Sequence, residues 1–520
     1  MAADLHRSKI MILQRIKNKF VLFLATILFV LLIIPTTTFI ILPCLIYRQL
    51  LLIYAKWCKP SLGKLLCARS ALAALDDIHT APKCTLLGVA VVAGDIDVRQ
   101  LQQDVMRRIV NAKDSNGHKM YPELQQYFSQ WGGYLFFKNV KDFRIENHVS
   151  VVEKSETKEM SELDLINLRV ELISKPYKKG QSPWEFVVLR NYHPKFPLMI
   201  DVDNNCADYT KHDSKTKKSV LIMRIHHGIA DGYSLLKLWL NSMQSENMTL
   251  EQIPQPTFHQ RSCFKTLMYN TWALLCVPYY VTEQLMTTYD SNFFHPKGIT
   301  LSRKCSAGSV TLPASIIKEI REKNNVTFTA VLMAALTGGV RNYMLANGIP
   351  IPDKMHCTQP LPWPNHPEKL RNFWSFCIIN LPLQVSDSKE RLKILHKKRE
   401  SLVRSTVPLL NLKLVSLVGS LPTPIIQWAT KRKATTIMMS NFPGPQEPSS
   451  MLGYPILDAS FGGGFGRGNL AFGISMISYN GTLRLGLGVD QSILPNQHQA
   501  QQLLNMIRDE IYILGQDVIV

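Results

Sequence analysis

The sequence predicts an α/β protein with two domains that follow an apolar N-terminal segment. Its 520 residues are too many for one ordinary hydrophobic core and suit two domains of roughly 200 residues each. Apolar residues make up 46% of the chain and charged residues 19%, which is typical of globular proteins rather than of disordered chains or multi-pass transporters. After residue 70, short apolar runs of strand length alternate with segments of helical spacing, as in α/β folds.

The N-terminal segment is predicted to lie in a membrane. No charged residue occurs from residue 20 to residue 47, and this stretch exceeds the roughly 20 residues that a spanning helix needs. A cleaved signal peptide does not fit, because its apolar region is only about 7 to 15 residues long. Pro35 and the threonines after it allow a re-entrant hairpin, and a single tilted span is the alternative. Residues 1–19 are basic, but basic residues flank the stretch equally, so they assign no orientation.

Residues 70–250 are predicted to form the first domain. Residues 84–93 indicate a buried strand that ends at Gly94, and a helix follows with Asp95 and Asp97 as capping candidates. Residues 187–189 and 220–225 indicate further strands, and residues 231–243 have the apolar spacing of a helix packed on a sheet. The segment between the last strand and this helix therefore lies at a strand end, where α/β folds place reactive side chains.

Residues 251–300 are predicted to connect the two domains. Pro254 and Pro256 mark a turn-rich stretch, and residues 267–280 are apolar and aromatic. Contact with lipid and a packed crossover segment explain that composition equally well.

Residues 301–520 are predicted to form the second domain. Residues 315–322 and 329–345 indicate helices, residues 376–383 a strand, and Asn480-Gly481 a type I′ turn between two alternating strands. A final amphipathic helix includes Leu503 and Ile507. For residues 407–428, a buried helix interrupted by prolines is favoured over a segment in the membrane interface.

The net charge of +20 favours an anionic partner. Nucleic acid is not supported, because zinc-finger spacing, an RNP-type aromatic run and a basic heptad array are all absent from the sequence. Anionic lipid and a phosphate-bearing cosubstrate explain the charge better. The ten cysteines form no Cys-x-x-Cys pair, so the sequence predicts no metal site. Glycosylation sequons occur at Asn247, Asn325 and Asn480 and matter only if the domain is lumenal.

The chemistry is predicted to lie in His226-His227-Gly228-Ile229-Ala230-Asp231-Gly232. An imidazole with an unperturbed pKa near about 6.5 suits a general base at neutral pH, and His227 is the candidate. Asp231 is expected to fix the loop by binding its backbone or a nearby arginine, and Gly232 to allow a close approach. His226 is expected to pack, since successive residues at a strand end point opposite ways. Gly462-Gly463-Gly464 is more typical of a flexible loop than of a nucleotide site.

This motif, after the strand at residues 221–225, resembles the signature of the wax ester synthase/acyl-CoA:diacylglycerol acyltransferase family. Pro183-Trp184-Glu185 resembles the family's Pro-Leu-Trp-Glu stretch, and Ser440-Asn441-Phe442-Pro443-Gly444-Pro445 resembles its Ser-Asn-Val-Pro-Gly-Pro segment. The likeness spans about residues 70 to 515. Two departures leave the substrate preference open: the leucine before Trp184 is missing, and Thr329-Ala330 replaces the family's Asn-Asp pair.

The resemblance implies two chloramphenicol-acetyltransferase-like, condensation-domain-like α/β domains with mixed sheets and a tunnel between them. It implies an O-acyltransferase that moves a long-chain acyl group from acyl-CoA to a fatty alcohol or diacylglycerol, without a metal or cofactor. His227 would be the catalytic base, with His226, Asp231 and Gly232 beside it. Trp184, Asn441, Pro443 and Gly444 would bind substrate. The N-terminal segment favours a membrane-anchored enzyme of the eukaryotic kind, expected in the endoplasmic reticulum with a cytosolic catalytic domain, with the plasma membrane as the alternative. A condensation-type enzyme using a carrier-protein thioester and a catalytically silent lipid-binding protein are the alternatives.

Overall fold

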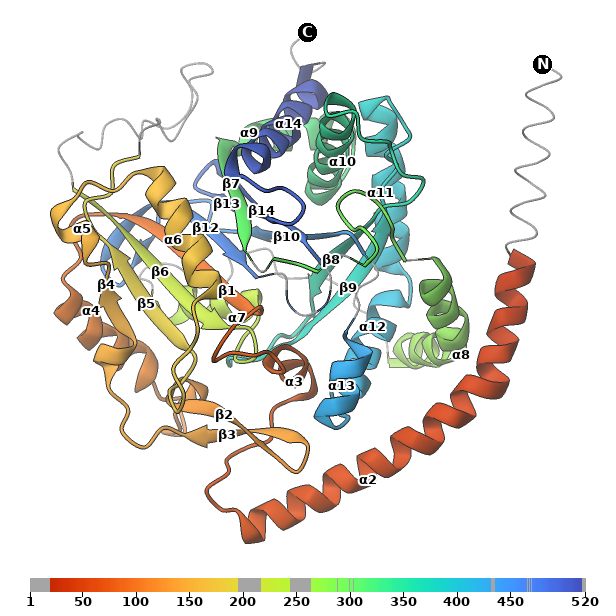
Figure 1. The fold of residues 1–520 in the computed structure, drawn as a ribbon, viewed down its shortest axis with the longest axis horizontal. Helices are drawn as coiled ribbons and strands as arrows, with labels where there is room; N and C mark the ends of the chain where they lie inside the picture. Colours follow the sequence, from red (N-terminus) through yellow and green to blue (C-terminus); the bar gives the residue numbers. More distant parts are fainter. Residues whose placement is uncertain are drawn as a thin grey trace.

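The computed structural model describes residues 19–194, 217–243, 263–287 and 289–516, apart from residues 299, 303, 432–434, 465, 467 and 469. The basic residues before Lys19, the sequon at Asn247 and the prolines at 254 and 256 lie outside the described residues. Figure 1 shows two α/β units side by side and a long N-terminal helix along one side of the molecule.

The N-terminal segment is one continuous helix, Lys19–Cys58, which includes a π-helical turn, η1 (Phe29–Ile33), and α2 (Ile34–Cys58). The hairpin alternative is wrong, because the helix continues past Pro35 and Pro43. Pro35 lies in the first turn of α2, directly after η1, and a π-turn is a usual way for a helix to accommodate such a residue. At 1.5 Å per residue the 40-residue helix is about 60 Å long, twice the thickness of a bilayer's hydrocarbon core.

The C-terminal part of this helix lies on the protein. Leu51 and Ala55 are buried against Tyr134 and Phe136 of the hairpin formed by β2 (Gln126–Trp131) and β3 (Tyr134–Asn139). The more N-terminal turns expose their apolar side chains, as at Phe39, which is 83% exposed. This first part of the helix therefore presents most of its apolar surface outward, away from the two α/β units.

Within the described residues, the first sheet has six strands in the order β11-β12-β1-β6-β5-β4. Its strands are β11 (Ser450–Met451), β12 (Tyr454–Gly463), β1 (Thr85–Ala93), β6 (Lys218–His226), β5 (Trp184–Leu189) and β4 (Val149–Val151). The pair β4–β5 is parallel and the others are antiparallel, so the sheet is mixed. One face packs on α4 (Val98–Val105), α7 (Gly232–Leu238) and the π-turn η6 (Trp239–Met243), and the other on α6 (Glu162–Ser174).

The predicted strands at residues 84–93, 187–189 and 220–225 are confirmed as β1, β5 and β6. Asp97 caps α4 by accepting from the N–H groups of Arg99 and Gln100, and Gly94 ends β1 with a φ of 103°.

The flexible loop predicted around residues 462–464 is wrong. Gly462 and Gly463 belong to β12, which pairs with β1 in the sheet of the first unit although it comes from the second half of the chain. A side chain on Gly463 would stand 2.8 Å from the carbonyl oxygen of Thr85, and one on Gly464 would collide with that of Lys83. Glycine is thus needed where two backbones approach closely. The domain boundaries at 250 and 301 stay a prediction. The strands β11 and β12 come from the second half of the chain but belong to the first sheet, and they join the two units.

The second sheet has the order β7-β14-β13-β10-β8-β9. Its strands are β7 (Cys305–Pro313), β14 (Thr482–Asp490), β13 (Phe472–Tyr479), β10 (Ile437–Pro443), β8 (His356–Pro362) and β9 (Trp374–Asn380). Its main core contains residues of α9 (Ala314–Lys323), α10 (Phe328–Ala346), α11 (Ser388–Arg404) and α14 (Gln497–Gly515). The hairpin turn is confirmed, with φ values of 43° at Asn480 and 78° at Gly481.

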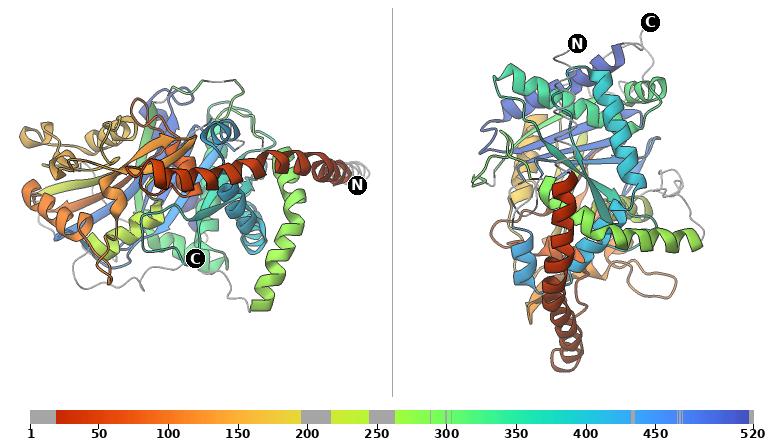
Figure 2. Two further views of the ribbon diagram at one scale, coloured as in Figure 1. Left: turned by 90° about the horizontal axis from the view of Figure 1, so that it is seen from below. Right: turned by 90° about the vertical axis from the view of Figure 1, so that its right-hand side faces the viewer.

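Three helices complete the side of the molecule that faces the N-terminal helix (Figures 1 and 2). Residues 263–287 of the predicted connection form α8 (Cys263–Thr287). Residues 407–428 form α12 (Val407–Val418) and α13 (Thr423–Ala429). Val407, Pro408 and Leu410 are buried, which supports the favoured packed-helix interpretation, although Trp428 is exposed.

Candidate active site

The motif forms the turn between β6 and α7. His226 is the last residue of β6, and Asp231 is the N-cap of α7, whose side chain accepts from the N–H of Ser234 at 2.8 Å. The turn is packed tightly: a side chain on Gly228 would stand 2.7 Å from Cβ of Ala74, which belongs to α3 (Ala68–Ala74). The geometry therefore requires a glycine after the two histidines.

His226 is fully enclosed. Its Nδ1 accepts from the N–H of Gly228 at 3.1 Å, which leaves the proton on Nε2, 3.5 Å from the Asp76 carboxylate. Burial alone would raise the pKa of Asp76, but hydrogen bonds from His226, Lys83 and Cys84 hold it below its ordinary value. Sequence reasoning did not find Asp76, which lies 150 residues before its partner. The packing role of His226 stays a prediction, and its burial supports it.

His227 differs from its neighbour because it is partly exposed. Its Nδ1 is buried and, among the described residues, has no hydrogen-bond partner, so the exposed surface lies on other atoms of the residue. Its backbone N–H donates to the carbonyl of Cys84 at 2.7 Å. Burial lowers the pKa of His227 below its ordinary value of 6.5, and its own backbone carbonyl and the Asp231 carboxylate oppose this shift only in part. The imidazole is therefore neutral at pH 7 and able to accept a proton.

Asp231 joins the two halves of the chain. Besides capping α7, its carboxylate accepts from the N–H of Phe373 at 2.7 Å and lies 3.0 Å from Nε2 of His366. Burial alone would raise the pKa of Asp231, but the hydrogen bonds from His366, Phe373 and Ser234 outweigh burial and hold that pKa below its ordinary value. The predicted loop-fixing partner was the backbone or an arginine; the structure has the backbone and a histidine.

Asn372 is a residue that sequence reasoning missed. It is fully buried, and its amide donates to the backbone carbonyl of His227 at 2.6 Å and to Oγ of Ser70 at 3.0 Å. The backbone carbonyl of Asn372 accepts from Nε of Arg69 at 3.1 Å. Asp231 of the motif accepts from the N–H of the next residue, Phe373, and so fixes the segment that contains Asn372. Asn372 in turn holds the backbone of His227. Nothing in the local pattern around Asn372 signals this, since its partner lies 145 residues earlier.

The second half of the chain reaches the motif through β10. The ring of Phe442 stands 2.8 Å from the place where Gly232 would carry a side chain. Asn441 donates to Oγ1 of Thr329 at 3.2 Å and accepts from Gln359 at 3.3 Å, so its amide is held within its own domain. Thr329 is thus a direct partner of Asn441.

The other three predicted substrate-binding residues, Pro443, Gly444 and Trp184, make their hydrogen bonds and packing contacts outside the motif loop. Pro443 ends β10 opposite Ser478, and the N–H of Gly444 donates to the carbonyl of Ser478 at 2.9 Å. Trp184 is 2% exposed, stacks on His148 and donates through its indole to the carbonyl of Leu124. Trp184 lies in the core beside β6 and does not line the apolar cavity next to the motif, so its substrate-binding role stays a prediction.

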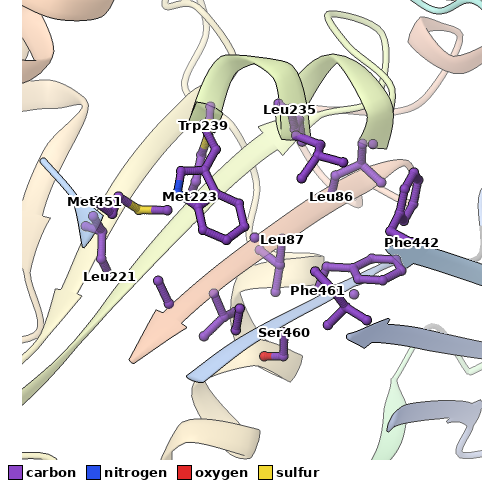
Figure 3. A pocket seen from close by; sticks show the side chains of 18 of the residues that line it. Leu86, Leu87, Leu221, Met223, Leu235, Trp239, Phe442, Met451, Ser460 and Phe461 are labelled. Carbon is purple, nitrogen blue, oxygen red and sulfur yellow. The ribbon is translucent and has the colours of Figure 1, made fainter. Parts of the chain in front are cut away.

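An apolar cavity of about 110 Å³ opens beside the motif, between the first sheet, α7 and β10 (Figure 3). Gly232 and Phe442 lie at its motif end; His227 does not line it. Gly88 of β1 helps to create the space, since no atom lies within 4 Å of the position of a side chain there. Further lining residues are apolar and come from β1, β6, the α7–η6 segment and β12: Leu86, Ala90, Leu221, Met223, Leu235, Leu236, Trp239, Met243, Ala459 and Phe461.

Comparison with known proteins identifies the C-terminal part of the chain. Residues 371–514 match the WS/DGAT C-terminal domain. This part of the chain therefore carries a domain of the WS/DGAT kind. The O-acyltransferase WSD of Acinetobacter baylyi is 25% identical over 326 residues, which cover 56% of this chain and 69% of that protein. A Mycobacterium tuberculosis protein named probable diacylglycerol O-acyltransferase tgs1 is 25% identical over 218 residues, which cover 40% of this chain. This match spans 46%, about half, of the mycobacterial protein.

The fold agrees with this WS/DGAT assignment. The wax ester synthase/diacylglycerol acyltransferase from Marinobacter aquaeolei matches with a TM-score of 0.57 and 15% identity, over 87% of this chain and 99% of that one. The predicted pair of condensation-domain-like α/β domains with mixed sheets is thereby confirmed. The WS/DGAT C-terminal domain begins at residue 371, so Asn372 and Phe373, which contact the motif, belong to it.

Proposed function

We propose that the protein is an O-acyltransferase that moves a long-chain acyl group from acyl-CoA to a fatty alcohol or diacylglycerol. The observation that carries this proposal is a neutral, partly exposed His227 on a rigid turn that ends at an apolar cavity. A long hydrocarbon chain gains about 0.8 kcal/mol for each methylene that it buries in such a cavity. The WS/DGAT C-terminal domain and the named activities of the relatives support the same reaction class.

The reaction needs one base and no further cofactor. His227 takes the proton of the alcohol as the alcohol oxygen attacks the thioester carbonyl. When the tetrahedral intermediate collapses, the carbon–sulfur bond breaks, and the imidazolium returns the proton to the sulfur of CoA. His227 is thus neutral before and after each turnover. The lowered pKa of His227 suits this cycle, because a base already protonated at pH 7 cannot start it.

The N-terminal helix is proposed to anchor the enzyme in the endoplasmic reticulum membrane with its catalytic domains in the cytosol. Lys19–Cys58 is long and apolar enough to cross a bilayer. An anchored enzyme meets its acceptor where that water-insoluble alcohol dissolves, and the net charge of +20 attracts anionic lipid and the phosphates of CoA.

The acceptor can be assigned directly. Microsomes that contain the full-length protein are incubated with labelled palmitoyl-CoA and either hexadecanol or diacylglycerol, and the labelled ester is separated by chromatography. We expect ester from at least one acceptor above the level of microsomes that lack the protein. Absence of ester with both acceptors, while lipid still binds, would support the silent lipid-binding alternative instead.

Replacing Asn372 by alanine is expected to lower kcat about tenfold with little change in the KM for acyl-CoA. The variant removes the amide that holds the His227 carbonyl, and a misplaced base slows the chemical step more than binding. Asn411→Ala is a matched control, because Asn411 is also buried and donates to a backbone carbonyl, that of Phe376, away from the motif. Both variants should lose about 1–3 kcal/mol of folding stability. An equal kcat for the two variants would show that Asn372 is structural only.

A further inference from the structure

Exposed apolar side chains gather on one side of the described surface. Outside Lys19–Cys58 most of them lie on α8, where Leu274 is 72% exposed and Leu275 is 69% exposed. Trp428 of α13 is 79% exposed. The other members on α8 and directly after it are Phe264, Leu267, Met268, Trp272, Tyr279, Leu285, Met286, Tyr289 and Phe293. Elsewhere in the described residues, large exposed hydrophobic side chains occur singly: Leu163, Leu345 and Ile513. A concentration of this kind marks an interaction surface.

This surface is continuous with the N-terminal helix. α8 lies beside η1, which is part of the exposed half of that helix, and α8 also packs on α12. Figure 2 shows α8 crossing beside the N-terminal half of the long helix. Tyr269 of α8 donates to the carbonyl of Ser405 at 2.7 Å, just before α12. Ile41 and Cys44 of the long helix also pack against a cluster that includes Ile426 of α13.

The composition of α8 suits the surface of a bilayer better than its interior. No charged residue occurs between Lys265 and Glu283, but Tyr269, Asn270 and Gln284 make the helix too polar for a span. Of the described helices, only Lys19–Cys58, or the pair α11 and α12 bent by 59°, has the length and apolarity to cross a membrane. Trp and Tyr side chains such as Trp272 are favoured at the level of the lipid headgroups.

We infer that α8 lies in the plane of the bilayer that Lys19–Cys58 enters, that Trp428 of α13 reaches the same bilayer, and that lipid covers this surface. The inference extends the proposed membrane anchor from one spanning helix to a broad contact. Its occupant is lipid rather than a second protein, because the surface adjoins the exposed apolar turns of the helix that is proposed to enter the bilayer.

This arrangement brings the bilayer close to the motif. Gly419 at the end of α12 lies directly against the backbone of Ala68 in α3, where a side chain would collide. At the other end of α3, Ala74 lies against Gly228 of the motif. Two packed helices, α12 and α3, therefore separate the lipid-facing surface from the turn that carries His227.

The test uses the full-length protein in nanodiscs of phosphatidylcholine and phosphatidylserine in equal parts. A photoreactive benzoylphenylalanine replaces Trp272 or Trp428, and in the control it replaces Leu163 of α6, which is exposed to a similar extent, 55% against 62% for Trp272. After irradiation, phospholipid adducts are measured by mass spectrometry. We expect at least about tenfold more lipid adduct at Trp272 and Trp428 than at Leu163.

Lipid labelling at Trp272 no higher than at Leu163, or cross-links from Trp272 to a second protein chain, would overturn the inference. The measurement does not depend on turnover, so it separates two failures. A protein that makes ester but shows no adduct at Trp272 keeps the proposed function and loses the lipid-covered α8. A protein that shows the adduct but makes no ester loses the proposed function only.

Discussion

Replacing His227 by alanine is expected to reduce ester formation at least about a hundredfold, which is the usual scale for the loss of a general base. In the microsome assay, kcat should fall while the binding of acyl-CoA changes little, because His227 does not line the apolar cavity. The variant should stay folded, since Nδ1 of His227 has no hydrogen-bond partner in the described structure that the substitution would remove.

His226→Ala is the matched comparison, because it changes the neighbouring histidine. It leaves the buried carboxylate of Asp76 without the Nε2–H that stands 3.5 Å away, and removing one hydrogen-bond partner from a buried polar group costs about 1–3 kcal/mol of stability. Thermal unfolding should therefore separate the two variants: a lower midpoint for His226→Ala and a nearly unchanged one for His227→Ala. If wild-type protein and His227→Ala make equal amounts of ester, His227 is not the base.

The local features of this fold could be predicted from the sequence. The strand, turn and helix around the motif depend on neighbouring residues, and so does the hairpin at Asn480-Gly481. Hydrophobic periodicity and turn-forming residues carry that information within a window of a few residues.

The contacts that hold the site could not be predicted, because they join residues far apart in the chain. Asp76, His366 and Asn372 each meet the motif through one side chain, and no spacing rule links a single buried asparagine to a histidine 145 residues earlier. The pairing of β12 with β1 was missed for the same reason: its glycines indicate flexibility locally but allow a close backbone approach in the sheet. The role of Trp184 was taken from the resemblance alone, whereas its indole is bonded inside the core.

Replacing Gly88 by leucine is expected to shift the enzyme from long to short acyl chains. The new side chain would point into the apolar cavity without meeting another atom at its Cβ, and its four carbons would displace about four methylenes of the substrate. At about 0.8 kcal/mol per methylene this loss is about 3 kcal/mol, or roughly a hundredfold in kcat/KM for palmitoyl-CoA.

The wild-type protein, Gly88→Ala and Gly88→Leu are compared with acyl-CoA donors of roughly four to sixteen carbons, because each buried methylene adds a similar gain in binding free energy. Butyryl-CoA should be used equally well by all three proteins, because its chain is too short to reach the filled space. Gly88→Ala should lie between the other two for long chains. A uniform loss of activity with every donor would show that Gly88→Leu damages the fold of β1 rather than the cavity, and an unchanged chain-length profile would place the acyl chain elsewhere in the protein.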